Sequence, residues 1–306
     1  MISTSTAALS LRVPGARLHY EVRGRGPLVA LVGAPMDAAS FAPPAELLAT
    51  DHTVLTTDPR GINRSVLDDP TQASTPELRA DDLSRLLTHL DAGPAAVLGS
   101  SGGAVTALAL AQARPDQVHT VIAHEPPLVE LLDDRERIHA QTDDVITTYL
   151  AGDVIGAWTT FMAQADIELP EGAIEVMFGG ERDPRTVADE RRWFAHELRA
   201  TTHWRPDLDA LRSITTRIVI GIGVDSTGQE CDHTSRALAA ALGIEPTLFP
   251  GDHTGFADDP ARFVTALRAV LNDRPEPHSP AGAPPTTTLG PFQGPHRDRL
   301  DPGDPS

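Results

Sequence analysis

Lysine does not occur in this sequence, so all 25 basic side chains are arginine, and 43 acidic side chains bring the net charge to −18. The absence of lysine excludes a Schiff-base enzyme and a Ser-Lys catalytic pair. A surface with this excess of negative charge repels phosphate backbones and anionic lipids. We therefore expect a small-molecule substrate as the partner, and no binding of nucleic acid or of a membrane surface.

Cysteine is almost absent as well, because Cys231 is the only one. A single cysteine excludes an internal disulfide and a cysteine-based zinc site, and it favours a reducing compartment. The first ten residues lack the basic and apolar segments of a signal peptide, and no run approaches the 18 apolar residues of a membrane span. The sequence thus predicts a soluble cytoplasmic protein without a metal ion or a cofactor.

Aromatic residues are few, with eight Phe, three Trp and two Tyr, so Ala, Val, Leu and Ile must build the core. Short apolar runs alternate with amphipathic segments, which is typical of βαβ units around a sheet buried on both faces. The β-like runs are residues 28–32, 53–57, 95–98, 118–123, 217–222 and 245–249, and the helical patterns are residues 75–91, 103–113, 229–242 and 260–271. This alternation predicts an α/β fold with a mostly parallel central sheet and helices on both faces.

The alternation is interrupted between residues 126 and 209, where the sequence becomes helical and charged, and it resumes near residue 217. We interpret 126–209 as a helical cap inserted between two parts of the core, 1–125 and 210–272. From residue 273 to 306 the chain contains nine prolines, each of which removes a hydrogen-bond donor and fixes φ. This composition predicts a disordered C-terminal tail.

The segment Gly99-Ser100-Ser101-Gly102-Gly103 lies between a β-like run and a good helical pattern. In this context G-x-S-x-G predicts a nucleophile on a sharp strand-to-helix turn, where the glycines leave room for a strained backbone. Only Ser101 fits the spacing, because position 98 is leucine. The turn also leaves the Gly102 N–H free at the helix N-terminus, where it can donate to a developing oxyanion.

With these residues the chain resembles the α/β-hydrolase superfamily, and in particular its small esterase and lactonase-like branch, over residues 12–272. Residues 57–65, Thr-Asp-Pro-Arg-Gly-Ile-Asn-Arg-Ser, look like the D-x-R-G-x-G-x-S segment of that superfamily. Asn63 replaces its second glycine and tolerates a positive φ. The resemblance implies structural roles for Asp58 and Arg60, and it implies serine-hydrolase chemistry.

A second oxyanion donor comes, by the same resemblance, from the loop after the run at 28–32. That loop reads Val32-Gly33-Ala34-Pro35, so the implied donor is the backbone N–H of Ala34. Val32 stands where the superfamily usually has histidine. We expect the oxyanion hole to be formed by Ala34 and Gly102, with a shape altered by Val32.

Among the twelve histidines, His253 is the candidate base, because its loop between the last β-like run and the last helix resembles the superfamily's G-x-H motif. Both this loop and the Ser101 turn emerge at the same edge of a parallel sheet. The acid should follow a strand and precede the histidine. Asp225, after the run at 217–222, is the expected acid. Glu125, after the run at 118–123, is the main alternative, and other carboxylates such as Asp232 stay open.

Aromatic residues of the cap and two residues at strand ends are the candidate substrate-binding surface: Trp158, Phe161 and Trp193, with Met36 and His124. The machinery suits a carboxylic ester, a lactone or a thioester, through an acyl-enzyme intermediate. Two alternatives remain open. The same triad can perform cofactor-free non-hydrolytic chemistry, such as perhydrolysis, C–C cleavage or a lyase or cyclase step, and the fold can serve as a non-catalytic ligand-binding protein.

Overall fold

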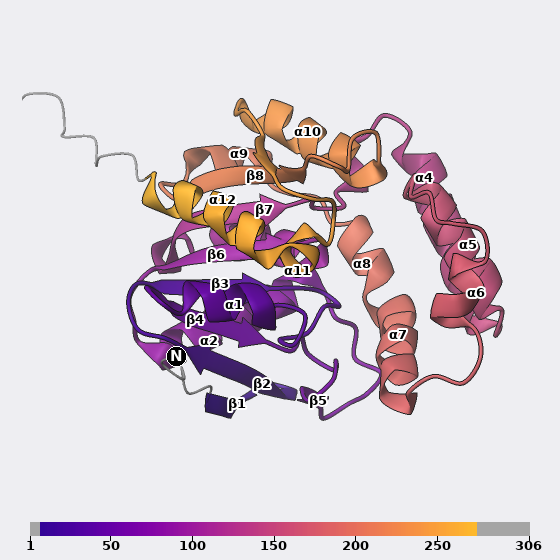
Figure 1. Cartoon of the computed structure of the whole chain (residues 1–306), viewed down its shortest axis with the longest axis horizontal. Helices are drawn as coiled ribbons and strands as arrows, with labels where there is room; N and C mark the ends of the chain where they lie inside the picture. The colour runs from indigo at the N-terminus through magenta and orange to yellow at the C-terminus, as the bar shows by residue number, and fades with distance from the viewer. Residues whose placement is uncertain (1–6, 274–306) are drawn as a thin grey trace, which may run out of the picture. The chain divides into compact units, whose positions relative to one another are not determined.

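The computed structural model describes residues 7–273, so the tail predicted for 273–306 lies, apart from Asp273, outside the described residues. Figure 1 shows strands enclosed by helices, with a group of helices to one side. The strands are β1 (Ala7–Val13), β2 (Ala16–Arg23), β3 (Leu28–Val32), β4 (Thr53–Thr57), β5 (Val66–Leu67), β6 (Ala95–Ser100), β7 (Val118–His124), β8 (Arg217–Gly223) and β9 (Thr247–Phe249). All six predicted strands are confirmed, whereas β1, β2 and β5 were not predicted.

The sheet has the order β1-β2-β4-β3-β6-β7-β8-β9, with β5 paired to β2. From β4 to β9 every neighbouring pair is parallel, while β2 pairs antiparallel with β1, β4 and β5. The chain passes from β3 outward to β4 and then returns to the other side of β3 with β6. This reversal is a topological switch point, the place where α/β sheets bind ligands at the carboxyl ends of their strands.

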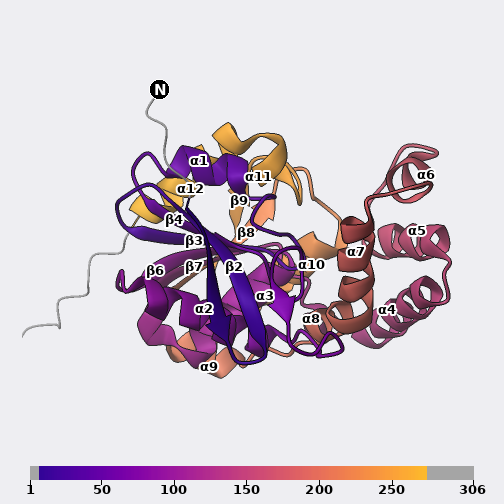
Figure 2. The same cartoon turned by 90° about the horizontal axis from the view of Figure 1, so that it is seen from below.

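Helices cover both faces of the sheet (Figure 2). One face carries α1 (Ala42–Leu48), α11 (Gly255–Asp258) and α12 (Pro260–Asn272), and the other carries α2 (Pro76–Leu90), α3 (Gly102–Ala113), α9 (Leu208–Ser213) and α10 (Glu230–Leu242). The helix α3 is apolar all round, and ten of its twelve residues are buried. It packs against β6, β7 and α2, so the helix behind the Ser101 turn is fixed by its surroundings.

Five further helices occupy the segment predicted as a cap: α4 (Arg135–Leu150), α5 (Val154–Gln164), α6 (Ala173–Phe178), α7 (Pro184–His196) and α8 (Leu198–Thr202). Both views place α4 to α7 beyond the sheet on one side. Their own core contains Val145, Tyr149, Ala157, Phe194 and Leu198. No helix of residues 7–273 has the length and apolarity needed to cross a membrane.

Candidate active site

Ser101 lies between β6 and α3 with φ 56° and ψ −126°, a backbone conformation that L-residues rarely adopt. A Cβ on Gly99 would collide with the carbonyl of Gly103, and a Cβ on Gly103 would collide with the carbonyl of Val32. Glycine is therefore required on both sides of Ser101 by the close approach of α3 to β6 and β3. The strained turn predicted from the sequence is present, and it leaves the Ser101 side chain partly exposed.

The two residues predicted to supply the oxyanion donors, Ala34 and Gly102, lie next to each other at this turn. Gly102 is the first residue of α3, so its N–H is one of those that a helix leaves without a partner in its own ladder. A Cβ on Gly102 would meet the carbonyl oxygen and the side chain of Ala34. The loop that carries Ala34 is anchored to Asp58, because the Ala38 N–H donates to Asp58 Oδ1 at 3.0 Å. This contact gives Asp58 the structural role expected for it.

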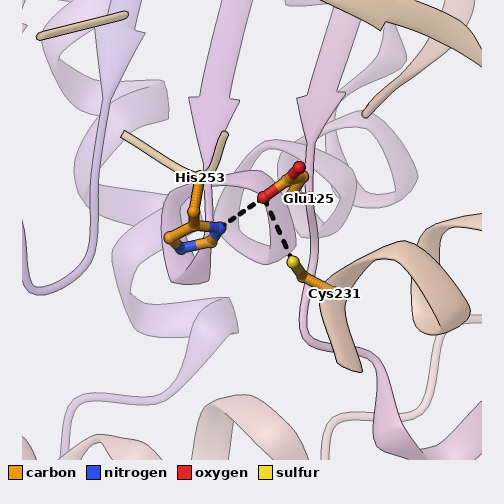
Figure 3. A group of neighbouring side chains, drawn as sticks. All are labelled: Glu125, Cys231 and His253. Atoms are coloured by element: carbon orange, nitrogen blue, oxygen red, sulfur yellow. Dashed lines mark hydrogen bonds and ion pairs between the residues drawn. The ribbon is translucent and has the colours of Figure 1, made fainter. Parts of the chain in front are cut away.

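His253 follows β9, and its Nδ1 lies 2.6 Å from Glu125 Oε2 (Figure 3). Glu125 is the first residue after β7 and has φ 51°. The end of β8 holds it twice, since its N–H donates to the Gly221 carbonyl at 3.0 Å and its Oε1 accepts from the Gly223 N–H at 2.7 Å. The carboxylate is thus fully buried and fixed, with its second oxygen turned to the imidazole.

Asp225, the acid expected from the sequence, forms no hydrogen bond or ion pair with His253, which is bonded to Glu125 instead. The Asp225 side chain is exposed on the loop after β8, while its backbone N–H donates to the Gly251 carbonyl at 3.0 Å. The prediction is corrected because β7 lies between β6 and β8 in the sheet, and the backbone at the end of β8 holds Glu125 in place. Asp232, the further possibility, accepts from Arg236 and the Gly228 N–H.

The environment of Glu125 keeps its carboxylate ionised. Burial by itself favours the neutral acid, but the interactions that favour the carboxylate, chiefly the hydrogen bond from His253, outweigh it, and the pKa of Glu125 falls to about 2. A buried carboxylate at this position can fix the Nδ1–H tautomer of the imidazole and stabilise an imidazolium. Nε2 of His253 is then the nitrogen left to accept a proton.

The sequence did not predict a thiol at this site, but Cys231 also contacts the Glu125 carboxylate. Cys231, in the first turn of α10, donates from Sγ to Glu125 Oε2 at 3.2 Å (Figure 3). Burial, reinforced by the Glu125 charge, raises the pKa of the Cys231 thiol, so it stays protonated. Spacing along the chain gave no signal for this contact, because 106 residues separate the two side chains.

Ser101 and His253 line one cavity of about 450 Å³ between the sheet edge and the cap helices. Four of the predicted substrate-binding residues line it too: Met36, Trp158, Phe161 and Trp193. Trp158 stacks on Phe178 with ring centroids 4.0 Å apart and lies 5.6 Å from the ring of Trp193. The cap therefore supplies aromatic surface to the cavity that Ser101 lines.

His124, the fifth predicted substrate-binding residue, is not at the cavity. It ends β7 with no exposed surface, its Nδ1 lies 3.2 Å from Ser100 Oγ, and its ring meets Phe249 and Phe263 edge-on. Burial lowers the pKa of His124 to about 4, which keeps the ring neutral. The prediction is wrong because the side chain at the strand end points into the core layer under α12.

Three carboxylates on the cavity wall were missed by the sequence reasoning: Asp37, Asp189 and Glu190. Asp37 accepts from Ser40 and from Asn63 Nδ2, and Asp189 accepts from the Asn63 N–H at 3.0 Å. Glu190 is neutralised by Arg182, whose Nη1 lies 2.6 Å from its Oε2. No arginine is among the residues that line this cavity in the described part of the chain.

Comparison with known proteins identifies the family of this chain. The sequence model described as "alpha/beta hydrolase fold" matches residues 26–156. The uncharacterized hydrolase YraK of Bacillus subtilis (strain 168) is 34% identical over 269 residues, which are 86% of this chain and 95% of YraK. The chain belongs to the alpha/beta hydrolase fold family.

Two further comparisons describe this alpha/beta hydrolase. The zearalenone hydrolase of Bionectria ochroleuca is 27% identical to it over 82% of this chain and 92% of that protein. The crystal structure of a hydrolase from Pseudomonas aeruginosa PA01 superposes with a TM-score of 0.64, at 20% identity, over 86% of this chain and 98% of the other. At that identity the structural match concerns the fold, while the sequence relatives support a hydrolase.

Proposed function

We propose that the protein is a serine hydrolase with a Ser101–His253–Glu125 triad, acting on a carboxylic ester, a lactone or a thioester. The observation that carries this proposal is the 2.6 Å contact between His253 and a buried Glu125, in a cavity that also contains a strained Ser101. A nucleophile, a base and an orienting carboxylate are the three parts that acyl transfer by serine requires.

In the proposed reaction the Ser101 oxygen attacks the carbonyl carbon while His253 Nε2 takes the hydroxyl proton. The backbone N–H groups of Ala34 and Gly102 stabilise the oxyanion. The tetrahedral intermediate formed in this way then collapses. It expels the alcohol or thiol, which receives the proton from His253, and an acyl-enzyme remains. Water, deprotonated by the same nitrogen, then releases the acid and restores Ser101.

The cavity supports an uncharged substrate with a flat apolar part. Trp158, Phe161 and Trp193 offer apolar surface on one side, and Asp37 and Asp189 place negative charge on the wall. A carboxylate on the substrate would be repelled there. Since one relative is named a zearalenone hydrolase, zearalenone is the first compound to test beside simple neutral aryl esters and lactones.

The experiment that tests the mechanism is labelling by a fluorophosphonate probe. The native chain should be labelled, and Ser101→Ala should not be, because the probe reacts with an activated serine oxygen. Ser100→Ala is the matched control, because the Ser100 hydroxyl is buried against His124 and should be dispensable for labelling. Folded native protein that neither takes up the probe nor hydrolyses an aryl ester would refute the proposal.

A further inference from the structure

Three different metal-binding side chains converge beside the cavity. One ligand atom each of His253, Glu125 and Cys231 lies within 4.8 Å of the other two, and the residues come from three separate parts of the fold (Figure 3). The group is unusual because Glu125 is fully buried and both other side chains face the same one of its oxygens. An imidazole, a carboxylate and a thiol form a donor set that suits zinc.

We propose that Glu125, Cys231 and His253 form an inhibitory binding site for Zn²⁺ or a similar borderline-soft divalent cation. The sequence predicted no metal because one cysteine cannot build a cysteine-based zinc site. The structure changes that conclusion, since one cysteine suffices when a histidine and a carboxylate supply the other ligands. Water completes a tetrahedral shell, as at other zinc sites with three protein ligands.

The geometry requires a small opening of the cluster. Zinc binds nitrogen and oxygen at about 2.0–2.2 Å and sulfur at about 2.3 Å, so tetrahedral N and O ligands stand roughly 3.3 Å apart. The present separation of Nδ1 and Oε2 is 2.6 Å, whereas that of Sγ and Oε2 is already 3.2 Å. His253 lies on a loop and its side chain is 29% exposed, so it is the ligand that can shift outward.

Glu125 is also oriented as a metal ligand needs to be. Its Oε1 is held by the Gly223 N–H at 2.7 Å, which leaves Oε2 directed at the other two ligands. Such hydrogen bonds to the outer oxygen of a carboxylate are the supports that fix metal ligands in proteins. The cluster therefore has both a donor set and a supporting contact.

The proton balance explains why a bound metal ion would inhibit the proposed hydrolysis. The thiol of Cys231 releases its proton to solvent and binds as thiolate. The ion replaces the proton on His253 Nδ1, and the ring stays neutral because Nε2 takes up a proton in its place. The thiol of Cys231 is therefore the source of the one proton released for each ion bound. With Nε2 protonated, His253 cannot accept the proton of Ser101. This inhibitory consequence rests on the proposed function, whereas the binding does not.

The test is a titration of the full chain with Co²⁺ as a spectroscopic probe, followed by competition with Zn²⁺. We expect one ion per chain, a thiolate-to-cobalt charge-transfer band, and release of one proton. Cys231→Ser should lose the band and bind at least tenfold more weakly, while still offering a hydrogen-bond donor to Glu125. His233→Asn, two residues further along the same helix and exposed, should titrate like the native chain.

The inhibition is measured in parallel by adding Zn²⁺ to the fluorophosphonate assay. Zn²⁺ should block labelling of the native chain, and Cys231→Ser should need at least tenfold more of it. The metal site is refuted if the native chain shows no charge-transfer band, or if Cys231→Ser binds and responds to Zn²⁺ as the native chain does. A clear band in a chain that never takes up the probe would instead uphold the site and refute the serine-hydrolase proposal.

Discussion

His253 Nδ1 and Glu125 Oε2 lie 2.6 Å apart, so the carboxylate that orients the proposed base follows β7 and not β8. We expect Glu125→Gln to lower kcat for an aryl ester by about 10³–10⁴, because the amide no longer fixes the tautomer or stabilises the imidazolium. Asp225→Asn changes the same charge on an exposed loop side chain and should stay within about twofold of the native rate. Steady-state kinetics on the three proteins measures both effects.

Equal losses in the two variants would contradict this assignment, and so would a large loss in Asp225→Asn alone. Because Glu125 is buried and doubly held by β8, its replacement also affects the fold. Circular dichroism and the thermal midpoint of each variant are the control, and Glu125→Asp serves as a second variant that keeps the charge and shortens the reach.

Local signals made the core of the fold predictable. The strands β3 and β4 coincide with the predicted ranges: all five residues of β3 are apolar and buried, and β4 consists of β-branched residues and leucine. The strands β1 and β2 mix polar and apolar side chains at the sheet's antiparallel edge, and they gave no such run. Ser101 and His253 were found for a similar reason, since their turn motifs are local in sequence.

The contacts of Glu125 and Cys231 could not be predicted from the sequence, because they join residues that are far apart along the chain. Asp225 and Glu125 both follow parallel strands, and sequence order permits either as acid. The proposed triad uses Glu125 because backbone groups of β8 hold this carboxylate in place, whereas the Asp225 side chain is exposed. Cys231 reaches the same carboxylate from α10, a contact that only the packing of that helix against β8 creates.

The buried ion pair between Arg60 and Asp82 predicts that Asp82 contributes much more to stability than Asp81, its neighbour in α2. Arg60 Nε and Nη2 donate to the two oxygens of Asp82 at 2.7 and 2.8 Å, with side chains 1% and 7% exposed. We expect Asp82→Asn to lower the free energy of unfolding by about 3–5 kcal/mol, because it leaves Arg60 buried without a counter-charge. Urea unfolding measures the loss.

Asp81 provides the matched control for that measurement. It forms a 2.7 Å ion pair with Arg85 in which both side chains are about half exposed. Asp81→Asn removes the same charge from the same helix and should change the free energy of unfolding by less than about 1 kcal/mol. Similar losses at the two positions would mean that burial does not decide the cost of breaking these pairs.

His124 predicts a pH-dependent component of stability. Burial lowers its pKa from 6.5 to about 4, so between these values the unfolded chain binds a proton that the folded chain does not. Stability from this group is present above pH 6.5 and is lost as the pH falls toward 4, by roughly 3 kcal/mol. His124→Asn, which keeps a polar atom for Ser100, should show less of this loss in urea unfolding at several pH values.

A second variant separates the buried imidazole from the general effect of removing a histidine. His233→Asn replaces an exposed histidine and should follow the native pH dependence. If His124→Asn and the native chain lose stability in parallel between pH 7 and 4, the neutral buried imidazole is not the source of the dependence.

Asp189 predicts how the cavity selects among substrates. It lies on the cavity wall on α7, and burial raises the pKa of its carboxyl even though the Asn63 N–H donates to it. A carboxylate on the substrate should be disfavoured by this charge. We expect Asp189→Asn to raise kcat/KM for a carboxylate-bearing aryl ester about tenfold relative to its neutral counterpart, since an asparagine oxygen can still accept from Asn63.

Asp183 separates this local effect from the overall charge of the protein. It caps the same helix, where its side chain accepts from the Thr186 N–H, and asparagine is an equally good cap. Asp183→Asn therefore changes the net charge identically outside the residues that line the cavity. The ratio of kcat/KM for the two esters should shift much less in Asp183→Asn than in Asp189→Asn. Equal shifts would assign the preference to the −18 net charge of the chain and remove Asp189 as its cause.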